Sequence, residues 1–586
     1  MSSKHFIHDP TKLVLDSLQA TIATNPSLGF QKDHKIIHRR LNSQHHGKVS
    51  IVTGGGSGHE PGFAGYVGKG FLTASVAGTI FASPSAEQVR QGLKHVPTDK
   101  GVFILIMNYT GDVLNFGMAA EDARAGNIEV ELFAVGDDVG VGRQKSGKVG
   151  RRGLAGTVLV MKLCGALAEM GGSLAEVHQL ARQVAANTAT VGASLGHVHV
   201  PGRVALGEAL SQNEIEIGMG IHNEPGSIRA TKALPDLVDT MLQQLLDQTD
   251  PDRSYVSIQS CDRVVLLINN LGGVSALELG AITTEVVNQL QSRYGHRPLR
   301  IYSGPFLSSL NGPGFSITLL KLEDTGLGEE MSMLELLDFP AEALGWASPL
   351  PSSAWSAESG PTSGSEHVAA SLKPSSGLTI DSGVTRRLVE SGLHRLIGAE
   401  PEVTRYDTIV GDGDCGTGMK RGAEAILEAL TYPSTTLDAV TFVSDIKAVV
   451  ETAMDGTSGA IFTIFLSGLV QGLRQLDDND PTPVDMSMWS SALTFALRTL
   501  NRYTPARPGD RTLMDALVPF VTSLATTLDV KQAAAEAATG AENTKALKPA
   551  FGRSVYVGSE DSWMGKIPDP GAWAVSEFFQ GLAEAT

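Results

Sequence analysis

The chain has 586 residues, of which 42% are hydrophobic and 19% charged, so it can bury a sizeable core and is not intrinsically disordered. Its 46 Lys and Arg residues against 63 Asp and Glu residues give a formal net charge of −17, which argues against nucleic acid or an anionic membrane as the main partner. Three widely spaced cysteines exclude a disulfide framework and a paired-cysteine zinc site. Because the first twenty residues carry charges throughout and the apolar runs are short, we expect a soluble, cytoplasmic protein.

Short β-branched runs that end in polar or glycine-rich segments alternate with helix-like stretches in the first part of the chain. The runs and the segments that follow them are 49–53 before 54–58, 102–107 before 108–112, and 264–268 before 269–273. This recurrence is typical of α/β units, in which ligands bind in the loops at the carboxyl ends of the strands. We expect an N-terminal α/β domain with two α/β subdomains.

A segment rich in Ser, Pro and Gly, at about 347–377, interrupts this pattern and predicts a linker. We therefore divide the chain into a domain at 1–345, a linker at 346–377 and a domain at 378–586. Beyond the linker, long Ala- and Leu-rich stretches such as 487–500 and 514–530 predict amphipathic helices, so the C-terminal domain is expected to be all-α.

Three segments of the first domain contain candidate ligand-binding side chains. The glycines of 54–58 leave backbone amides bare beside Ser57 and His59, although the same pattern suits a plain turn. Asp112 follows a buried strand, where it is either a general base or a helix cap. His222 follows a strand-like stretch into a loop bounded by Gly and Pro, and a lone histidine there is more often structural.

Two nucleotide-binding motifs are not favoured, because each lacks a residue that the motif requires. Residues 142–148 resemble a P-loop, but Val149 stands where the Ser or Thr that binds Mg²⁺ belongs. Residues 54–59 lack the last glycine of a dinucleotide-binding fingerprint, because His59 occupies its place.

Asp407, Asp412 and Asp414 form the sharpest candidate site. Three carboxylates within eight positions repel one another, and a hard divalent cation with oxygen ligands compensates that repulsion. The spacing does not follow an EF-hand, so Mg²⁺ bridging nucleotide phosphates is favoured, with a solvated acidic turn as the alternative.

Ordered blocks along both domains resemble the single-chain, ATP-dependent dihydroxyacetone kinases, or triokinases. The blocks read GGGSGHEPGFAGYVGKG (54–70), NYTGD (108–112), GRRGLAGT (150–157), IEIGMGIHNEPG (215–226), DTIVGDGDCGTG (407–418), GTSGA (456–460), GDRTLMDAL (509–517), GRSVYVG (552–558) and DPGA (569–572). So many blocks in one order exclude a chance match.

The resemblance implies a role for each of the candidate residues in the first domain. It implies that His222, as a neutral imidazole, binds the ketone covalently as a hemiaminal, that His59 orients and polarises the substrate, and that Asp112 accepts the proton of the attacking hydroxyl. The substrate-binding residues that it implies are Gly56, Ser57, Gly58, His59, Met107, Asp112 and His222. The implied substrates are dihydroxyacetone and D-glyceraldehyde.

For the second domain, the resemblance implies a helical barrel that binds ATP and Mg²⁺, and a homodimer. Asp407, Asp412 and Asp414 would hold the metal ions. The implied ATP-binding residues are Cys415, Gly416, Thr417, Gly418, Thr457, Ser458, Gly459, Thr512, Leu513, Arg553, Asp569, Pro570 and Gly571.

The chain departs from the family pattern at three positions. Met107 replaces a lysine that usually contacts substrate, Asp455 replaces a glycine beside the nucleotide, and Gly418 replaces a common threonine. Two alternatives to kinase activity stay open. One is cyclisation of FAD at the same nucleotide site, which some members of the family perform, and the other, favoured by Met107 and Asp455, is a ketone-sensing regulatory protein with weak phosphoryl transfer.

Overall fold

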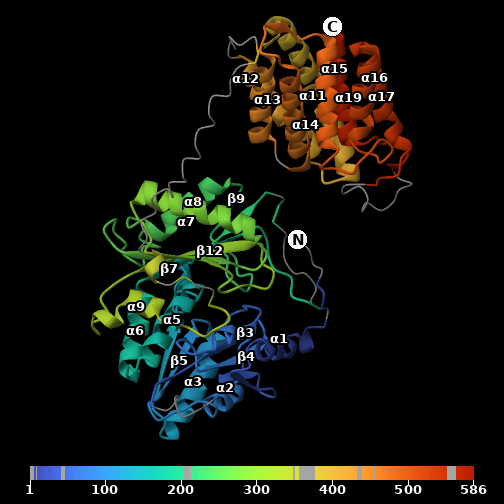
Figure 1. Ribbon diagram of the computed structural model, residues 1–586. Coiled ribbons are helices and arrows are strands. Elements are labelled where there is room, and N and C mark those ends of the chain that lie inside the picture. The colour runs from blue at the N-terminus through green and yellow to red at the C-terminus, as the bar shows by residue number, and fades with distance from the viewer. Residues whose placement is uncertain are drawn as a thin grey trace. The chain divides into compact units, whose positions relative to one another are not determined.

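The computed structural model describes residues 5–7, 9–40, 47–202, 210–211, 213–346, 350, 352–355, 376–431, 438–454, 456–550 and 563–586. The chain forms two compact units, Met1–Gly360 and Pro361–Thr586 (Figure 1). The division falls inside the segment that the sequence assigns to a linker. Most of that segment lies outside the described residues, so its bounds stay a prediction. An α/β unit followed by a helical unit confirms the predicted fold class.

The first sheet of the α/β unit has six strands in the order β1-β2-β4-β3-β5-β6. Strands β3 to β6 pair in parallel, whereas β2 pairs antiparallel with both of its neighbours. The strands are β1 (Leu28–Gln31), β2 (Ile36–Arg39), β3 (Ser50–Ser57), β4 (Ala74–Ile80), β5 (Val102–Met107) and β6 (Val130–Val135). The helices of this part are α1 (Pro10–Thr24), α2 (Ala86–Leu93), α3 (Thr110–Ala125), α4 (Arg143–Ser146), α5 (Gly156–Glu169) and α6 (Leu174–Ala186).

Strand β5 is buried on both faces of the first sheet, as its continuous apolar run predicts. Phe103, Leu105 and Met107 pack in one apolar cluster with residues of α5 and α6. Ile104 and Ile106 pack on the opposite face with residues of α2 and α3. Helices therefore cover both faces of the sheet at β5, and the segment 108–112 begins at the carboxyl end of this strand.

The second sheet has six strands in the order β11-β10-β12-β7-β8-β9, and only β10 and β11 pair in parallel. Its strands are β7 (Thr188–Ser194), β8 (Ile215–Ile217), β9 (Ile228–Ala230), β10 (Val264–Asn270), β11 (Arg300–Gly304) and β12 (Gly314–Lys321). Helices α7 (Leu234–Leu246) and α8 (Ala276–Tyr294) cover one face, and α9 (Met333–Asp338) and α10 (Ser352–Trp355) follow the sheet. On the other face, Val265 and Leu320 share an apolar cluster with α5, which is buried along almost its whole length.

The glycines after residue 53 differ from the sequence expectation, since they continue β3 as far as Ser57 rather than forming a loop. Their role is close packing against the neighbouring backbone. A Cβ atom on Gly54 would lie 2.1 Å from the carbonyl oxygen of Val76 on β4, and one on Gly56 would lie 2.7 Å from the amide nitrogen of Ala82.

The second unit is a closed ring of helices. Each of its long helices packs against the next one in the chain, and α19 packs against α11, which confirms the expected helical barrel (Figure 1). The ring surrounds an apolar cavity of about 380 Å³. The helices are α11 (Ser382–Val410), α12 (Cys415–Thr431), α13 (Ala439–Ala453), α14 (Gly456–Leu476), α15 (Met486–Leu500), α16 (Met514–Thr527), α17 (Val530–Asn543) and α19 (Pro570–Glu584), with a short pair of strands, β13 (Leu378–Thr379) and β14 (Thr482–Pro483).

Helix α14 is, among the described residues, the one helix whose length and mean hydropathy of 1.3 reach those of a membrane-spanning helix. It packs between α13 and α15 in the ring and lines the apolar cavity with Ile461, Phe462 and Phe465. Its composition is therefore accounted for by its place in the ring.

A buried carboxylate fixes the start of α5, the helix that both sheets share. The two oxygens of Asp137 accept hydrogen bonds from the backbone N–H groups of Leu154, at 2.6 Å, and Gly156, at 2.8 Å. Asp137 is fully buried, so no water can replace either bond.

We expect Asp137→Ala to destabilise the α/β unit by about 3 kcal/mol, because two buried N–H groups lose their acceptor. Denaturant unfolding followed by tryptophan fluorescence measures the change. Asp122→Ala, which breaks an exposed ion pair with Arg90, is the control and should cost less than about 1 kcal/mol. Equal stability of the two variants would contradict the role assigned to Asp137.

Candidate active site

Two histidines from different sheets meet in the α/β unit. His59 follows β3 of the first sheet, and His222 lies on the loop after β8 of the second sheet. Their Nε2 atoms are 3.0 Å apart, and the rings meet edge to face with centroids 4.8 Å apart. The structure therefore brings together two of the histidines that the sequence selected.

The segment between β11 and β12 holds both histidine loops. The Nδ1–H of His59 donates to the carbonyl oxygen of Ser308 at 2.9 Å, and the hydroxyl of Ser309 donates to the carbonyl oxygen of Ile221 at 2.5 Å. The sequence analysis missed both serines, because nothing in the local pattern around them signals a ligand-binding role.

Aromatic side chains enclose the two imidazoles. Phe81 stacks on His59 with ring centroids 5.1 Å apart, and both Phe81 and Tyr109 meet the ring of His222 edge to face. His59 is only 2% exposed. This burial, together with the charge of His222, lowers the pKa of His59 to about 3, so His59 is a neutral hydrogen-bond acceptor at Nε2.

Glu224 binds His222 through two contacts. One carboxylate oxygen accepts the backbone N–H of His222 at 2.9 Å, and the other lies 3.1 Å from Nδ1 of the ring. Burial alone would raise the pKa of Glu224, but the hydrogen bonds and charge of His222 outweigh it and lower that pKa to about 2. Sequence reasoning missed Glu224, although a carboxylate two residues after a loop histidine is a usable signal.

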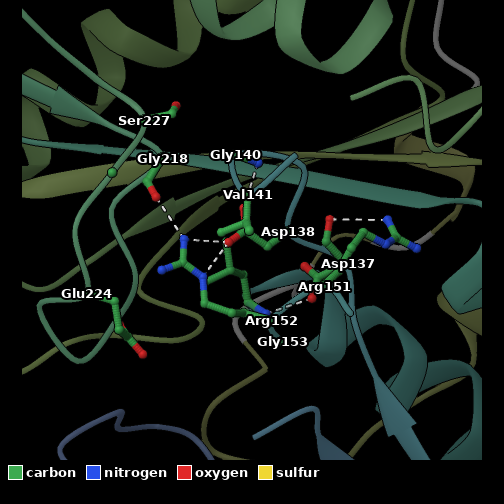
Figure 2. A network of polar contacts seen from close by, with 12 residues as sticks. Asp137, Asp138, Gly140, Val141, Arg151, Arg152, Gly153, Gly218, Glu224 and Ser227 are labelled. Atoms are coloured by element: carbon green, nitrogen blue, oxygen red, sulfur yellow. Dashed lines mark hydrogen bonds and ion pairs between the residues drawn. The ribbon is translucent and has the colours of Figure 1, made fainter. Parts of the chain in front are cut away.

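A half-buried cation, Arg152, lies next to this loop. Arg152 donates from Nε to Asp138 at 2.7 Å and from Nη2 to the carbonyl oxygen of Gly218 at 2.7 Å. Asp138 is fully buried and also accepts the N–H of Gly140 at 2.7 Å. Figure 2 shows the guanidinium directed at Asp138 and Gly218, with Glu224 on the adjacent loop. Arg152 thus connects the first subdomain to the start of the His222 loop.

Asp112 lies in the first turn of α3 and is 5% exposed. Burial raises its pKa to about 6, although a hydrogen bond with Ser83 and the charge of His222 act in the opposite direction. Its Oδ1 atom is buried and has no hydrogen-bond partner among the described residues. A buried carboxylate with a free oxygen and a pKa near neutrality is suited to accept a proton.

The remaining predicted substrate-binding residues fall into two groups. Gly56, Ser57 and Gly58 lie at the end of β3 and lead directly to His59, but the hydroxyl of Ser57 donates to the carbonyl oxygen of Gly78. Met107 is 2% exposed and belongs to the apolar core, with Gly153 packed against its Cβ. The expectation that Met107 faces the substrate is therefore corrected: its alternating position on β5 directs the side chain into the core.

The acidic cluster of the helical unit lies at the junction of α11 and α12. Ligand oxygens of Asp407, Asp412 and Asp414 all lie within 4.8 Å of one another. Asp407 is buried in the last turn of α11 and accepts the backbone N–H of Cys415 at 3.0 Å. Gly411 permits this arrangement, since a Cβ there would lie 2.2 Å from the carboxylate of Asp407. The donor set fits Mg²⁺, which prefers carboxylate oxygens.

Several helix N-termini converge on this cluster. Cys415 begins α12 and lies close to Asp414, to Asp569 and to Ser458 at the start of α14. Leu513, before α16, packs against Gly571 at the start of α19. Helix N-termini favour phosphate groups, so the predicted ATP-binding residues of these turns occupy a suitable place. Those residues are Cys415, Gly416, Thr417, Gly418, Thr457, Ser458, Gly459, Thr512, Leu513, Asp569, Pro570 and Gly571.

Asp569 is the N-cap of α19 and accepts the N–H of Ala572 at 2.8 Å. Burial raises its pKa to about 7, and the nearby Asp515 and Asp407 act in the same direction. Arg553 and Asp455, which the sequence also placed beside the nucleotide, lie outside the described residues.

A two-sheet α/β unit with a pair of histidines, joined to a helical ring with an acidic cluster, defines a two-part phosphotransferase. The Dak1 domain matches residues 19–345 and the DAK2 domain matches residues 409–584. The chain therefore belongs to the dihydroxyacetone kinase family, which confirms the resemblance.

Relatives in this family match the chain along its full length. A dihydroxyacetone kinase of Pichia angusta is 44% identical over 607 residues, covering 100% of this chain and 99% of that protein. A triokinase/FMN cyclase of Homo sapiens is 34% identical over 595 residues, with the same coverage. The crystal structure of the dihydroxyacetone kinase from C. freundii in complex with AMP-PNP and Mg²⁺ matches with a TM-score of 0.64 and 32% identity, over 100% of both chains.

We expect the double variant Asp412→Asn, Asp414→Asn to bind ATP roughly tenfold or more weakly in the presence of Mg²⁺, because two of the three ligand charges are lost. Calorimetry with and without Mg²⁺ measures the effect. Glu451→Gln, which alters an exposed carboxylate on α13, is the control. Unchanged Mg²⁺-dependent binding in the double variant would show that this cluster does not hold the metal.

Proposed function

We propose that the protein transfers the γ-phosphoryl group of ATP to a primary hydroxyl of dihydroxyacetone, and also to that of D-glyceraldehyde. The observation that supports this most directly is the meeting of His59 and His222 beside the buried carboxylate of Asp112. The names of the full-length relatives point to the same substrate class.

In this mechanism His222 holds the substrate by a covalent bond. The Nε2 lone pair attacks the carbonyl carbon, and the π pair of the C=O bond moves onto oxygen. The oxygen takes the proton that lies between His59 and His222 and becomes the hydroxyl of a hemiaminal. Such a bond selects ketones and aldehydes over glycerol, which has hydroxyl groups but no carbonyl. Phe81 and Tyr109 pack edge to face against the ring of His222, whose side chain stays 23% exposed and so remains open to a substrate.

Asp112 accepts the proton of the hydroxyl that attacks the γ-phosphorus atom. Its free buried oxygen and raised pKa suit this step. Asp407, Asp412 and Asp414 would hold Mg²⁺, which when bound would neutralise charge on the phosphates, and the helix N-termini would orient the phosphates.

Kinase activity accounts for more of the structure than either alternative. Cyclisation of FAD would use the nucleotide site and leave the histidine pair without a role. A ketone sensor would use the histidine pair and leave the three clustered carboxylates without one. A coupled ADP-release assay with dihydroxyacetone, glyceraldehyde and glycerol tests the proposal, and ADP release that is independent of the carbonyl compounds would refute it.

We propose in addition that the protein is a cytoplasmic homodimer. The acidic composition and the family resemblance support this assignment. Sedimentation analysis of the full chain measures the oligomeric state, and a monomer at micromolar concentration would contradict it.

His222→Ala should abolish the covalent adduct with dihydroxyacetone, because the proposed C–N bond is formed by Nε2 of His222. Native mass spectrometry detects the adduct. His178→Ala removes a histidine on α6 that pairs with Glu131 and should leave the adduct intact. An adduct that persists in His222→Ala would eliminate the covalent role.

The turnover number should rise with pH and show an inflection near pH 6, because Asp112 must lose its proton before it can act as a base. In Asp112→Asn this inflection should disappear, and turnover should fall roughly hundredfold or more. A pH series of kcat for both proteins provides the measurement. A wild-type profile retained in the variant would assign the inflection to another group.

A further inference from the structure

We propose that Glu224 is the positioning residue of the nucleophile, and that Arg152 holds the loop from which Glu224 acts. The inference rests on the proposed covalent capture by His222. In this inference Glu224 determines which nitrogen of His222 carries a proton and balances the positive charge of the adduct. Arg152 keeps Glu224 in place.

The hydrogen-bond partners of the two imidazoles show that Nδ1 of each ring, the nitrogen that faces away from the other ring, carries a proton. The carbonyl oxygen of Ser308 can only accept, so Nδ1 of His59 carries a proton. The Glu224 carboxylate is ionised, since hydrogen bonds from His222 keep its pKa low, so Nδ1 of His222 also carries a proton. With both outer nitrogens protonated, the two inner Nε2 atoms can approach to 3.0 Å as a hydrogen bond only if one proton lies between them.

With three protons on two imidazoles, the pair carries one positive charge, and Glu224 supplies the compensating charge. The Glu224 carboxylate lies 3.1 Å from Nδ1 of His222, so the counter-charge lies on the His222 side of the pair. The charged or titratable groups that surround the pair are Glu224, Tyr109, Arg152, Asp138 and Asp112.

Capture of the ketone then conserves both protons and charge. His222 passes its Nε2 proton to His59, and the freed lone pair forms a bond to the carbonyl carbon. The π pair of the C=O bond moves onto oxygen, which takes the proton back from His59. One C–N bond and one O–H bond form, the π bond and the Nε2–H bond of His222 break, and His222 remains an imidazolium paired with Glu224.

Glycine at position 220 lets Glu224 and Arg152 approach the same point. A Cβ there would lie 2.1 Å from Oε2 of Glu224 and 2.5 Å from Nη1 of Arg152. Arg152 is itself held by Asp138 and binds the carbonyl oxygen of Gly218, two residues before. At the far end of the loop, the buried Glu216 accepts the N–H of Gly226 at 2.9 Å. The loop is thus fixed at both ends, with Glu224 and His222 between them.

The test compares Glu224→Gln with the wild-type chain. Glutamine can still accept the Nδ1–H but carries no charge, so we expect KM for dihydroxyacetone to rise roughly tenfold to hundredfold, with a smaller change in kcat. Native mass spectrometry across a pH series measures the pH above which the adduct no longer forms. We expect this pH to be lower in Glu224→Gln, because the cationic adduct is no longer stabilised by a neighbouring carboxylate. Glu323→Gln, an exposed position after β12, is the control and should show neither change.

Gly220→Ala provides a second variant that keeps every charge. Its methyl group would displace Glu224 or Arg152, and we expect the same rise in KM and the same shift of the pH limit. An unchanged KM and pH profile in folded Glu224→Gln and Gly220→Ala would overturn the inference. If the wild-type chain formed no adduct and transferred no phosphoryl group, the proposed function itself would fail, which is a different result.

Discussion

The hydrogen bond between the Nε2 atoms of His59 and His222 is the contact on which the α/β unit depends for its chemistry. It joins residues 163 positions apart in the chain and on two different sheets. Two ring nitrogens can be this close only with one proton between them. In the proposed protonation pattern both Nδ1 atoms also carry protons, so the groups around the pair have to support one positive charge. The carboxylate of Glu224, the carbonyl of Ser308 and the aromatic walls each satisfy one part of that requirement.

The packing of the two sheets against each other sets the distance between the two imidazoles. Helix α5 is buried between them, and Asp137 fixes its first turn. The segment between β11 and β12 then binds both histidine loops through neighbouring serines. A displacement of either sheet would change the distance between the imidazoles, so core packing and site geometry are not separable in this unit.

The sequence predicted the elements of this fold better than the contacts between them. Local patterns placed the buried strand at 102–107, Asp112, His222 and the acidic cluster, because each depends on residues close in the chain. The partnership of Glu224 with Arg152 depends on two subdomains packing together, which no local pattern contains. Met107 was misplaced because the family position suggested a substrate contact, whereas strand alternation directs its side chain into the core.

The closed ring of the second unit has a consequence for biosynthesis. Each helix packs against its neighbours in chain order, and α19 is the element that joins the ring back to α11. While a ribosome is still making the chain, the apolar interior that α14 lines has no final wall. This unit therefore closes only after α19 has emerged, so it folds after translation of that helix. The α/β unit is complete roughly 10–50 seconds earlier, because translation proceeds at roughly 5–20 residues per second.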